Sequence, residues 1–272
     1  MGRRGEAALL LLLVGAAGRV RDVAAALFVL GDSLVDDGNN DALARADYYP
    51  YGVDFPPLGA ATGRFCNGKT VADALCDLLG RRYVPPYTST RGLNGTAAMQ
   101  GERFSLSQQV LNLEAAAPHR LRLRRPAMYS LGLRKFLLAD VGPLGCTPGL
   151  RASAETGRQG QCEEHGGAVQ PGAQIARRPA QRRPPPCRRL RLYGNTYAGV
   201  QDMIHNPGPS LQITTTCGLC VPLVAPCGER ERYVFWDAYH PTQAANLVMA
   251  QMAFDGTPEH VYPLNLRQLA EL

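Results

Sequence analysis

The chain has 272 residues, of which 45% are apolar and 19% are charged. This length suits one large α/β domain or two small ones, and the apolar content is sufficient for a globular core. The net charge of +6 is concentrated in one segment, so it is not by itself evidence for a nucleic-acid partner.

The first residues have the pattern of a secretory leader. Two arginines precede an apolar run over residues 7–17, and small residues follow. The run is too short to cross a bilayer as a helix, which needs about 20 residues. We predict a signal peptide over residues 1–25, cleaved between Ala16 and Ala26, and a secreted, extracellular protein without a transmembrane segment. The alternative is a buried N-terminal helix.

Eight cysteines agree with an oxidising compartment. Cys217 and Cys220 have the spacing of a zinc knuckle, but no second pair stands at a matching distance. Disulfides are therefore the better interpretation, and no metal is expected; the spacing alone names no pairing. The triplet Asn94-Gly-Thr96 is an acceptor sequence for N-glycosylation, which supports secretion weakly.

Ser33 stands where a short strand is expected to give way to a helix. Residues 27–30 form an apolar run of the length of a buried strand, Gly31 ends it, and Asp32 is a good helix N-cap. A serine at such a junction exposes its hydroxyl, and its own N–H can bind negative charge that develops beside it. An acyl-transfer nucleophile needs both features.

The whole run ALFVLGDSLVDDGNN, residues 26–40, resembles the nucleophile block of the GDSL esterase/lipase family, the plant branch of the SGNH hydrolases. The resemblance implies that Ser33 is the nucleophile. It also implies an α/β fold, a three-layer α/β/α sandwich on a mostly parallel, flavodoxin-like sheet. Val35 fills the last place of a Gly-x-Ser-x-Gly pattern, which argues against the nucleophile elbow of the α/β-hydrolases.

The next stretch continues the resemblance. A loop rich in Tyr and Pro over residues 47–57 leads to the turn TGRFCNGK at 62–69, which is similar to a turn of the family. Apolar residues at helical spacing predict a helix over 71–79 that ends at Gly80. We expect this passage to shape the substrate cleft, with a purely scaffolding role as the alternative.

The resemblance also implies which groups bind the oxyanion, but this chain matches the family at only some of these positions. The family uses the backbone N–H of a glycine as one donor. In this chain Gly101 is the better match and Gly92 the competitor. As an alternative, either glycine can simply permit a turn. The small-residue loop that normally follows this glycine is missing, so the resemblance is interrupted near 101. The family's third donor is the Asn of Gly-x-Asn-Asp, and no such motif occurs in this chain.

The junction at 132–134 conflicts with a parallel sheet. Residues 127–133 form a predicted strand that runs directly into a second strand-like run from Arg134. Parallel neighbours need a crossover of about a dozen residues. Either the sheet has lost a βα unit and is incomplete, or one of the two runs is not a sheet strand.

Residues 165–192 interrupt the resemblance a third time. Within them, positions 176–191 contain seven arginines and four prolines, a density that excludes a helix where the family has one. Our hypothesis is that a disturbed reading frame or a mis-joined gene model produced this segment, which we expect to be a solvated loop. A basic arm that binds polyanions is the alternative.

The C-terminal part returns to the family pattern. Asp237 and His240 stand three apart on one loop before Pro241, and a helix is expected from about Thr242. An aspartate so placed can orient an imidazole and stabilise its protonated form. The Asp-x-x-His-Pro pattern is similar to the family's base motif, which implies that His240 is the general base and Asp237 its partner.

Together these features predict a secreted serine hydrolase of carboxylic esters, lipid or acyl and acetyl esters, in one domain over residues 26–272. His240 would deprotonate Ser33, and the N–H groups of Ser33 and Gly101 would bind the oxyanion. No cofactor is implied and no nucleic-acid partner is expected. The alternative is a catalytically impaired or misfolded relative, at most a scaffold that binds carbohydrate or lipid.

Overall fold

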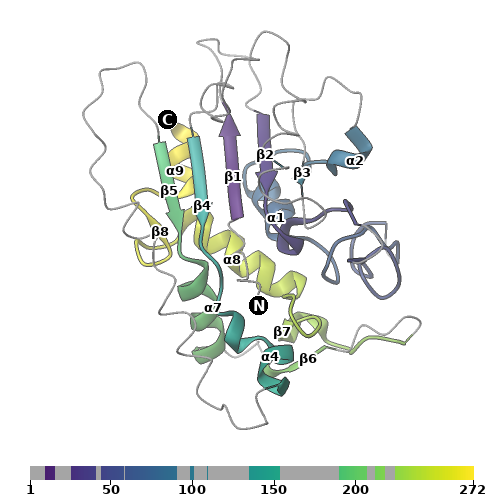
Figure 1. Cartoon of the computed structure of the whole chain (residues 1–272). Helices are drawn as coiled ribbons and strands as arrows, with labels where there is room; N and C mark the ends of the chain where they lie inside the picture. The colour runs from purple at the N-terminus through teal and green to yellow at the C-terminus, as the bar shows by residue number, and fades with distance from the viewer. Residues whose placement is uncertain are drawn as a thin grey trace, which may run out of the picture.

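The computed structural model describes residues 10–15, 26–40, 44–57, 59–90, 99–100, 109, 135–153, 190–206, 212–217 and 224–272. Its centre is a six-stranded sheet with the order β3-β2-β1-β4-β5-β8 (Figure 1). The strands are β1 (Leu10–Gly15), β2 (Ala26–Leu30), β3 (Met99–Gln100), β4 (Lys135–Ala139), β5 (Leu190–Gly194) and β8 (Val261–Tyr262). A second sheet pairs β6 (Gln212–Thr216) with β7 (Tyr233–Phe235).

Four strands of the large sheet run in one direction. β2 is parallel to β3, and β4 is parallel to β5. β1 is antiparallel to both β2 and β4, so these two flanking strands point the same way. β8 closes the far edge antiparallel to β5. The sheet is therefore mixed, with its long strands mostly in a common direction, and it agrees with the predicted incomplete α/β fold.

The strand β1 occupies the position between β2 and β4. Leu11 is paired with Leu30 on one side and with Leu138 on the other. This is the part of the sheet where the junction at 132–134 predicts a lost βα unit. The run from Arg134 does form a sheet strand, β4, whereas the predicted strand over 127–133 lies outside the described residues. β1 belongs to the predicted leader, and cleavage after it would remove this strand from the sheet.

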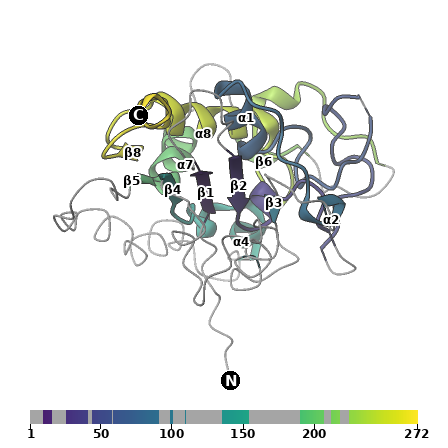
Figure 2. The same ribbon diagram turned by 90° about the horizontal axis from the view of Figure 1, so that it is seen from above.

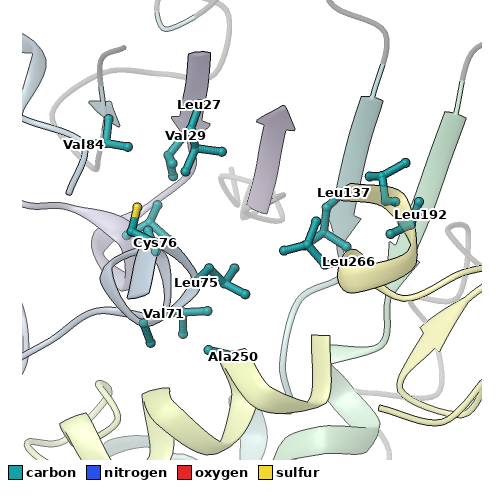
Figure 3. Close-up of a cluster of buried hydrophobic side chains, with 14 of the residues drawn as sticks. Leu27, Val29, Val71, Leu75, Cys76, Val84, Leu137, Leu192, Ala250 and Leu266 are labelled. Carbon is teal, nitrogen blue, oxygen red and sulfur yellow. The ribbon is translucent and has the colours of Figure 1, made fainter. Parts of the chain in front are cut away.

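Three helices cover one face of the large sheet: α1 (Val71–Leu78), α8 (Gln243–Asp255) and α9 (Leu266–Glu271), as Figure 2 shows from above. Buried side chains of the strands and helices meet between them in the main core (Figure 3), which includes Leu27, Val29, Leu75, Leu137, Leu192, Ala250 and Leu266. Full burial of one such large apolar side chain stabilises the fold by about 1.5–3 kcal/mol. The described residues thus form two of the three predicted layers.

The helices predicted over 71–79 and from about Thr242 form where the sequence signals place them. Thr70 and Asp73 make a reciprocal capping box at the start of α1, and Gly80 follows its end with a φ of 61°. Thr242 caps α8 by accepting a hydrogen bond from the N–H of Ala245. These caps fix where the chain enters and leaves each helix.

The remaining helices lie near the ends of the strands. They are α2 (Tyr87–Thr90), α4 (Pro148–Ser153) and α7 (Thr196–His205). Met203 of α7 is buried in a second core cluster with residues of β7 and α8. In the part of the chain that the structure describes, no helix is both long and apolar enough to cross a membrane.

The cysteines are only partly paired in the described ranges. Cys217 and Cys227 form a disulfide, which agrees with disulfides rather than a zinc knuckle around Cys217. Cys66 and Cys76 are buried free thiols. Within the same ranges, no group of three His, Cys, Asp or Glu side chains is arranged to hold a metal ion. The sequon at 94–96 and nearly all of the basic segment lie outside the described residues; β5 begins inside that segment, at Leu190.

Candidate active site

Ser33 begins a single 3₁₀ turn, Ser33–Val35, directly after β2. Asp32 caps this turn by accepting a hydrogen bond from the N–H of Leu34 at 3.0 Å. The longer helix expected here does not form. Asp36 instead accepts hydrogen bonds from the N–H groups of the next residues, for example Asn39 at 2.7 Å, and such local bonds compete with a helical ladder.

His240 and Asp237 lie beside this turn, on the loop that follows β7. The His240 Nε2 is 2.8 Å from the Ser33 Oγ. The Nδ1 of the same ring is 2.7 Å from the Asp237 Oδ2. The structure therefore brings the three predicted residues into one line of hydrogen bonds, although Ser33 and His240 are 207 positions apart in the chain.

Asp237 is held on both of its oxygens. Its Oδ1 accepts hydrogen bonds from the backbone N–H groups of Tyr239 at 2.8 Å and His240 at 2.7 Å. The hydroxyl of Tyr51 donates to its Oδ2 at 2.8 Å. Burial of Asp237 is the largest single effect and opposes ionisation. The hydrogen bond and charge of His240, together with the backbone hydrogen bonds from Tyr239 and His240, outweigh it and lower the pKa of this carboxyl. Asp237 is thus kept as a carboxylate.

The imidazole of His240 is enclosed by an aromatic ring and a second carboxyl group. The ring of Phe65 lies 5.0 Å from the imidazole, centroid to centroid. Asp32 faces His240 from the start of the turn Ser33–Val35, which we call the nucleophile turn after the role predicted for Ser33. Burial raises the pKa of Asp32, while the hydrogen bond from Leu34 and the charge of His240 lower it in part. The side chain of His240 is 15% exposed, so part of the imidazole is in contact with solvent.

A buried glutamine holds the peptide immediately before the nucleophile turn. Gln109 accepts a hydrogen bond from the Gly31 N–H at 2.9 Å and donates one to the Gly31 carbonyl at 2.7 Å. β3 ends at Gln100, which pairs with Leu30, so the ladder stops one residue before Gly31. The Gln109 amide continues the pairing at this point and fixes the backbone that carries Ser33.

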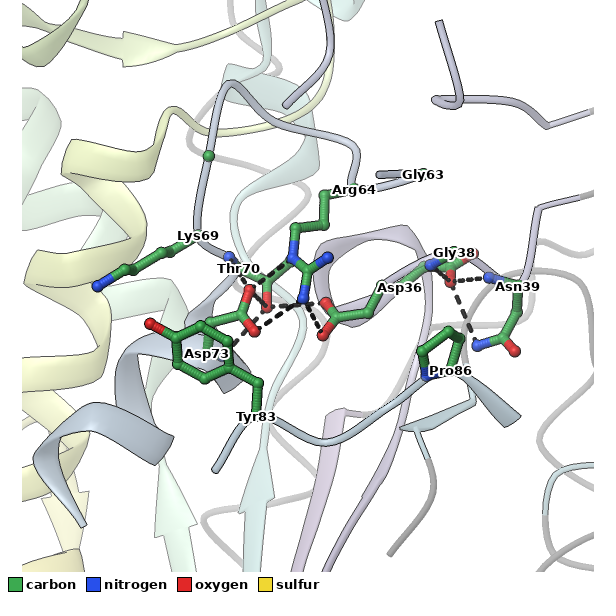
Figure 4. Close-up of polar contacts among 12 residues, drawn as sticks. Asp36, Gly38, Asn39, Gly63, Arg64, Lys69, Thr70, Asp73, Tyr83 and Pro86 are labelled. Atoms are coloured by element: carbon green, nitrogen blue, oxygen red, sulfur yellow. Dashed lines mark hydrogen bonds and ion pairs between the residues drawn. The ribbon is translucent and has the colours of Figure 1, made fainter. Parts of the chain in front are cut away.

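A second polar network joins the nucleophile turn to α1 (Figure 4). The guanidinium of Arg64 is 2.7 Å from Asp37 and makes two hydrogen bonds to Asp73, all buried. Gly38 and Gly63 approach closely, because a Cβ added at Gly63 would lie 2.6 Å from the Gly38 Cα. The turn at 62–69 therefore supports the nucleophile turn rather than only bordering a cleft.

Comparison with known proteins agrees with this arrangement. No family model matches the chain. The chain is nevertheless 32% identical to GDSL esterase/lipase At5g08460 of Arabidopsis thaliana, over 91% of its own residues and 88% of that protein. The chain belongs to the GDSL esterase/lipase family. It is likewise 31% identical to GDSL esterase/lipase 7 of the same plant, over 94% of this chain and 95% of that protein. It is therefore of the carboxylic ester hydrolase type.

The alignments also bear on the interruptions in this GDSL chain. The alignment with GDSL esterase/lipase At5g08460 spans 342 residues, which is more than the 272 residues of the chain. That relative therefore carries internal segments that this chain lacks. This agrees with a chain from which blocks of the family, including Gly-x-Asn-Asp, are missing.

The predicted oxyanion donors of this GDSL chain are less completely described than the three side chains Ser33, Asp237 and His240. Ser33 is the first residue of the 3₁₀ turn. Among the described residues, its backbone N–H donates no hydrogen bond. Gly101 and its competitor Gly92 lie outside the described residues, so Gly101 as a donor remains a prediction.

Sequence reasoning missed two side chains that hold the triad. Tyr51 contacts Asp237 across 186 positions, and Gln109 contacts Gly31 across 78. Neither contact leaves a local spacing signal. The only hint of Tyr51 was its place in the Tyr-rich loop over residues 47–57, and there was none for Gln109.

Proposed function

We propose that this chain is a secreted serine hydrolase that cleaves carboxylic esters through an acyl-enzyme on Ser33. The observation that carries the proposal is the line of hydrogen bonds from the Ser33 Oγ through both nitrogens of His240 to Asp237, at 2.8 and 2.7 Å. This is the geometry of a nucleophile, a general base and an orienting carboxylate.

The reaction takes two steps. The His240 Nε2 accepts the Ser33 proton while the Oγ attacks the carbonyl carbon of the ester, and Asp237 stabilises the imidazolium that results. His240 then gives this proton to the leaving alcohol, and the acyl group remains on Ser33. In the second step His240 deprotonates a water that attacks the acyl-enzyme, and Ser33 is released with its proton.

The oxyanion of each step would be bound by the N–H of Ser33 and, as the family resemblance implies, of Gly101. A third donor, the Asn of the family motif, is missing from the chain. Loss of one such donor typically costs about 2.7–4 kcal/mol, roughly 10²–10³ in turnover. We therefore expect slow turnover.

The exposed side chains beside His240 support an ester with an apolar group. Tyr239 is 57% exposed and its ring lies against Gly149 of α4, where a Cβ would approach it to 2.9 Å. The neighbouring Leu150 is 44% exposed. An apolar acyl chain or a lipid tail can cover such side chains and remove their apolar surface from water.

The test is hydrolysis of p-nitrophenyl acetate and butyrate by the secreted protein beside a Ser33→Ala variant. The proposal predicts measurable release of p-nitrophenol that falls to the uncatalysed rate in the variant. Equal rates in the two proteins would remove the enzyme function and favour the second candidate, a catalytically dead scaffold. The missing Gly-x-Asn-Asp motif is the observation that favours that candidate.

A further inference from the structure

We propose that Tyr51 is a positioning residue of the catalytic site, whose hydroxyl holds Asp237 in the orientation and charge state that His240 requires. This inference rests on the proposed function, because it concerns the same three side chains. The hydrogen bond that carries this role joins the Tyr51 hydroxyl to Asp237, so Tyr51 acts on His240 through Asp237.

Tyr51 contacts the same oxygen of Asp237 that His240 contacts. The Tyr51 hydroxyl donates to the Asp237 Oδ2 at 2.8 Å, and this oxygen also receives the His240 Nδ1 at 2.7 Å. The other oxygen is held by two backbone N–H groups. Without Tyr51, the hydrogen bond left on Oδ2 among the described residues is the one from the His240 Nδ1, which is the group that Asp237 has to orient. With Tyr51, this oxygen has a donor that is independent of His240.

Tyr51 is itself rigidly held. It is 7% exposed, and its ring packs edge-on against Tyr48 at 5.2 Å and against Phe65 at 6.1 Å between centroids. Phe65 in turn lies against the imidazole of His240. One aromatic cluster therefore connects the loop over 44–57 to both members of the Asp–His pair. Such edge-to-face pairs stabilise the cluster beyond the burial of apolar area.

A phenol that donates to a carboxylate withdraws negative charge from it. This favours the ionised form of Asp237 and, at the same time, weakens its attraction for the proton on the His240 Nδ1. Asp32, from the nucleophile turn, is a charged group that faces His240, and the hydroxyl of Tyr51 is a titratable group that faces Asp237. Arg64, on the neighbouring turn, is engaged by Asp37 and Asp73 instead.

The first test compares Tyr51→Phe with Tyr48→Phe, which removes a hydroxyl from the same cluster but not from Asp237. We expect kcat to fall about tenfold in Tyr51→Phe with KM little changed, because a hydrogen bond to a charged group is lost. The acid limb of kcat/KM should move about half a pH unit upward, since the carboxylate then stabilises imidazolium more strongly. Tyr48→Phe should change neither.

The inference is overturned if Tyr51→Phe has the wild-type acid limb, or if Tyr48→Phe shows the same changes, since packing alone would then explain them. A thermal unfolding curve of each variant identifies any loss of folded protein. An unfolded Tyr51→Phe would be replaced by Tyr51→Met, for which the same shift of the acid limb is expected.

A second readout does not depend on turnover. The proton uptake of His240 can be followed by ¹³C NMR of the labelled imidazole in Ser33→Ala, with and without Tyr51→Phe. An upward shift of the titration midpoint in the double variant supports the role of Tyr51 even in a protein without esterase activity. An unchanged midpoint contradicts it. Failure of the proposed function and failure of this inference therefore give different results.

Discussion

At the scale of single residues, Asp237 has the most constrained chemistry in the site. Its pKa is lowered, so it remains ionised below the ordinary range of an aspartate. A carboxyl with a lowered folded-state pKa stabilises the fold at pH values above its unfolded value, and this contribution is lost as the pH falls through the folded value. When activity is lost on acidification at pH values above about 5, the protonated group is therefore not Asp237. His240 must be neutral to act as the base, so its protonation causes this loss.

Asp237→Asn tests the orienting role of this carboxylate. The amide would present a donor to the His240 Nδ1 and would favour the wrong tautomer, so we expect kcat to fall about 10⁴-fold with the fold retained. The measurement is steady-state ester hydrolysis near pH 7.5, with Asp47→Asn as a control because Asp47 pairs only with Arg45 on the surface among described residues. A decrease below tenfold would mean that Asp237 does not orient the base.

The sequence predicted Ser33, Asp237 and His240 because each stands in a short family motif, and the structure brings these three together. Their catalytic roles remain the proposal made above. The sequence did not predict Tyr51 and Gln109. Their contacts depend on side-chain placement across the folded core, which no periodicity encodes.

At the scale of elements, the buried group around Arg64 connects the nucleophile turn to α1. Two carboxylates, Asp37 and Asp73, share this one guanidinium. Burial and then the charge of Asp73 raise the pKa of Asp37 well above its ordinary value. Because the folded-state pKa is raised, ionisation of Asp37 opposes folding, and this destabilisation grows as the pH rises through the folded value.

Arg64→Met tests this group. It removes the cation and leaves two buried carboxylates, so we expect the free energy of unfolding at pH 7 to fall by about 3–5 kcal/mol. Urea unfolding followed by tryptophan fluorescence measures it, because the single Trp236 is fully buried. The surface variant Arg45→Met should unfold at nearly the wild-type midpoint. A loss below about 1 kcal/mol in Arg64→Met would show that the ion pairs contribute little.

Element prediction succeeded where a local cap or breaker marks a boundary, as at Thr70, Gly80 and Thr242. It failed at the nucleophile turn, because the side chain of Asp36 forms local hydrogen bonds that end the helix after one turn. It also did not predict β1. The apolar run of a leader and the apolar run of a buried strand have the same composition, so pattern alone cannot separate them.

At the scale of the whole molecule, the position between β2 and β4 decides how complete the site is. In the family that this chain resembles, one strand leads into the Gly-x-Asn-Asp motif. The next strand of the family corresponds to β4 of this chain. In this chain β1 pairs with both neighbours instead. The six-strand order was not predictable, because it depends on which segment fills the gap left by the interruption at 132–134.

Restoring the missing block tests this account. We expect a variant with a family Gly-x-Asn-Asp segment and its following helix inserted between Leu133 and Arg134 to raise kcat about 10²–10³-fold, because one oxyanion donor is regained. The control insertion carries Ala in place of the donor Asn and should give no comparable gain. Equal rates for the two insertions would show that the absent donor does not limit turnover.

The central claim is that a base from the C-terminal part of the chain activates a serine near the N-terminal part. Labelling with a fluorophosphonate, followed by peptide mass spectrometry, tests it most directly. We expect one adduct on the peptide that contains Ser33, absent in Ser33→Ala and formed at least about 10²-fold more slowly in His240→Ala. No adduct, an adduct on a different serine, or equal labelling of the wild type and His240→Ala would contradict the claim.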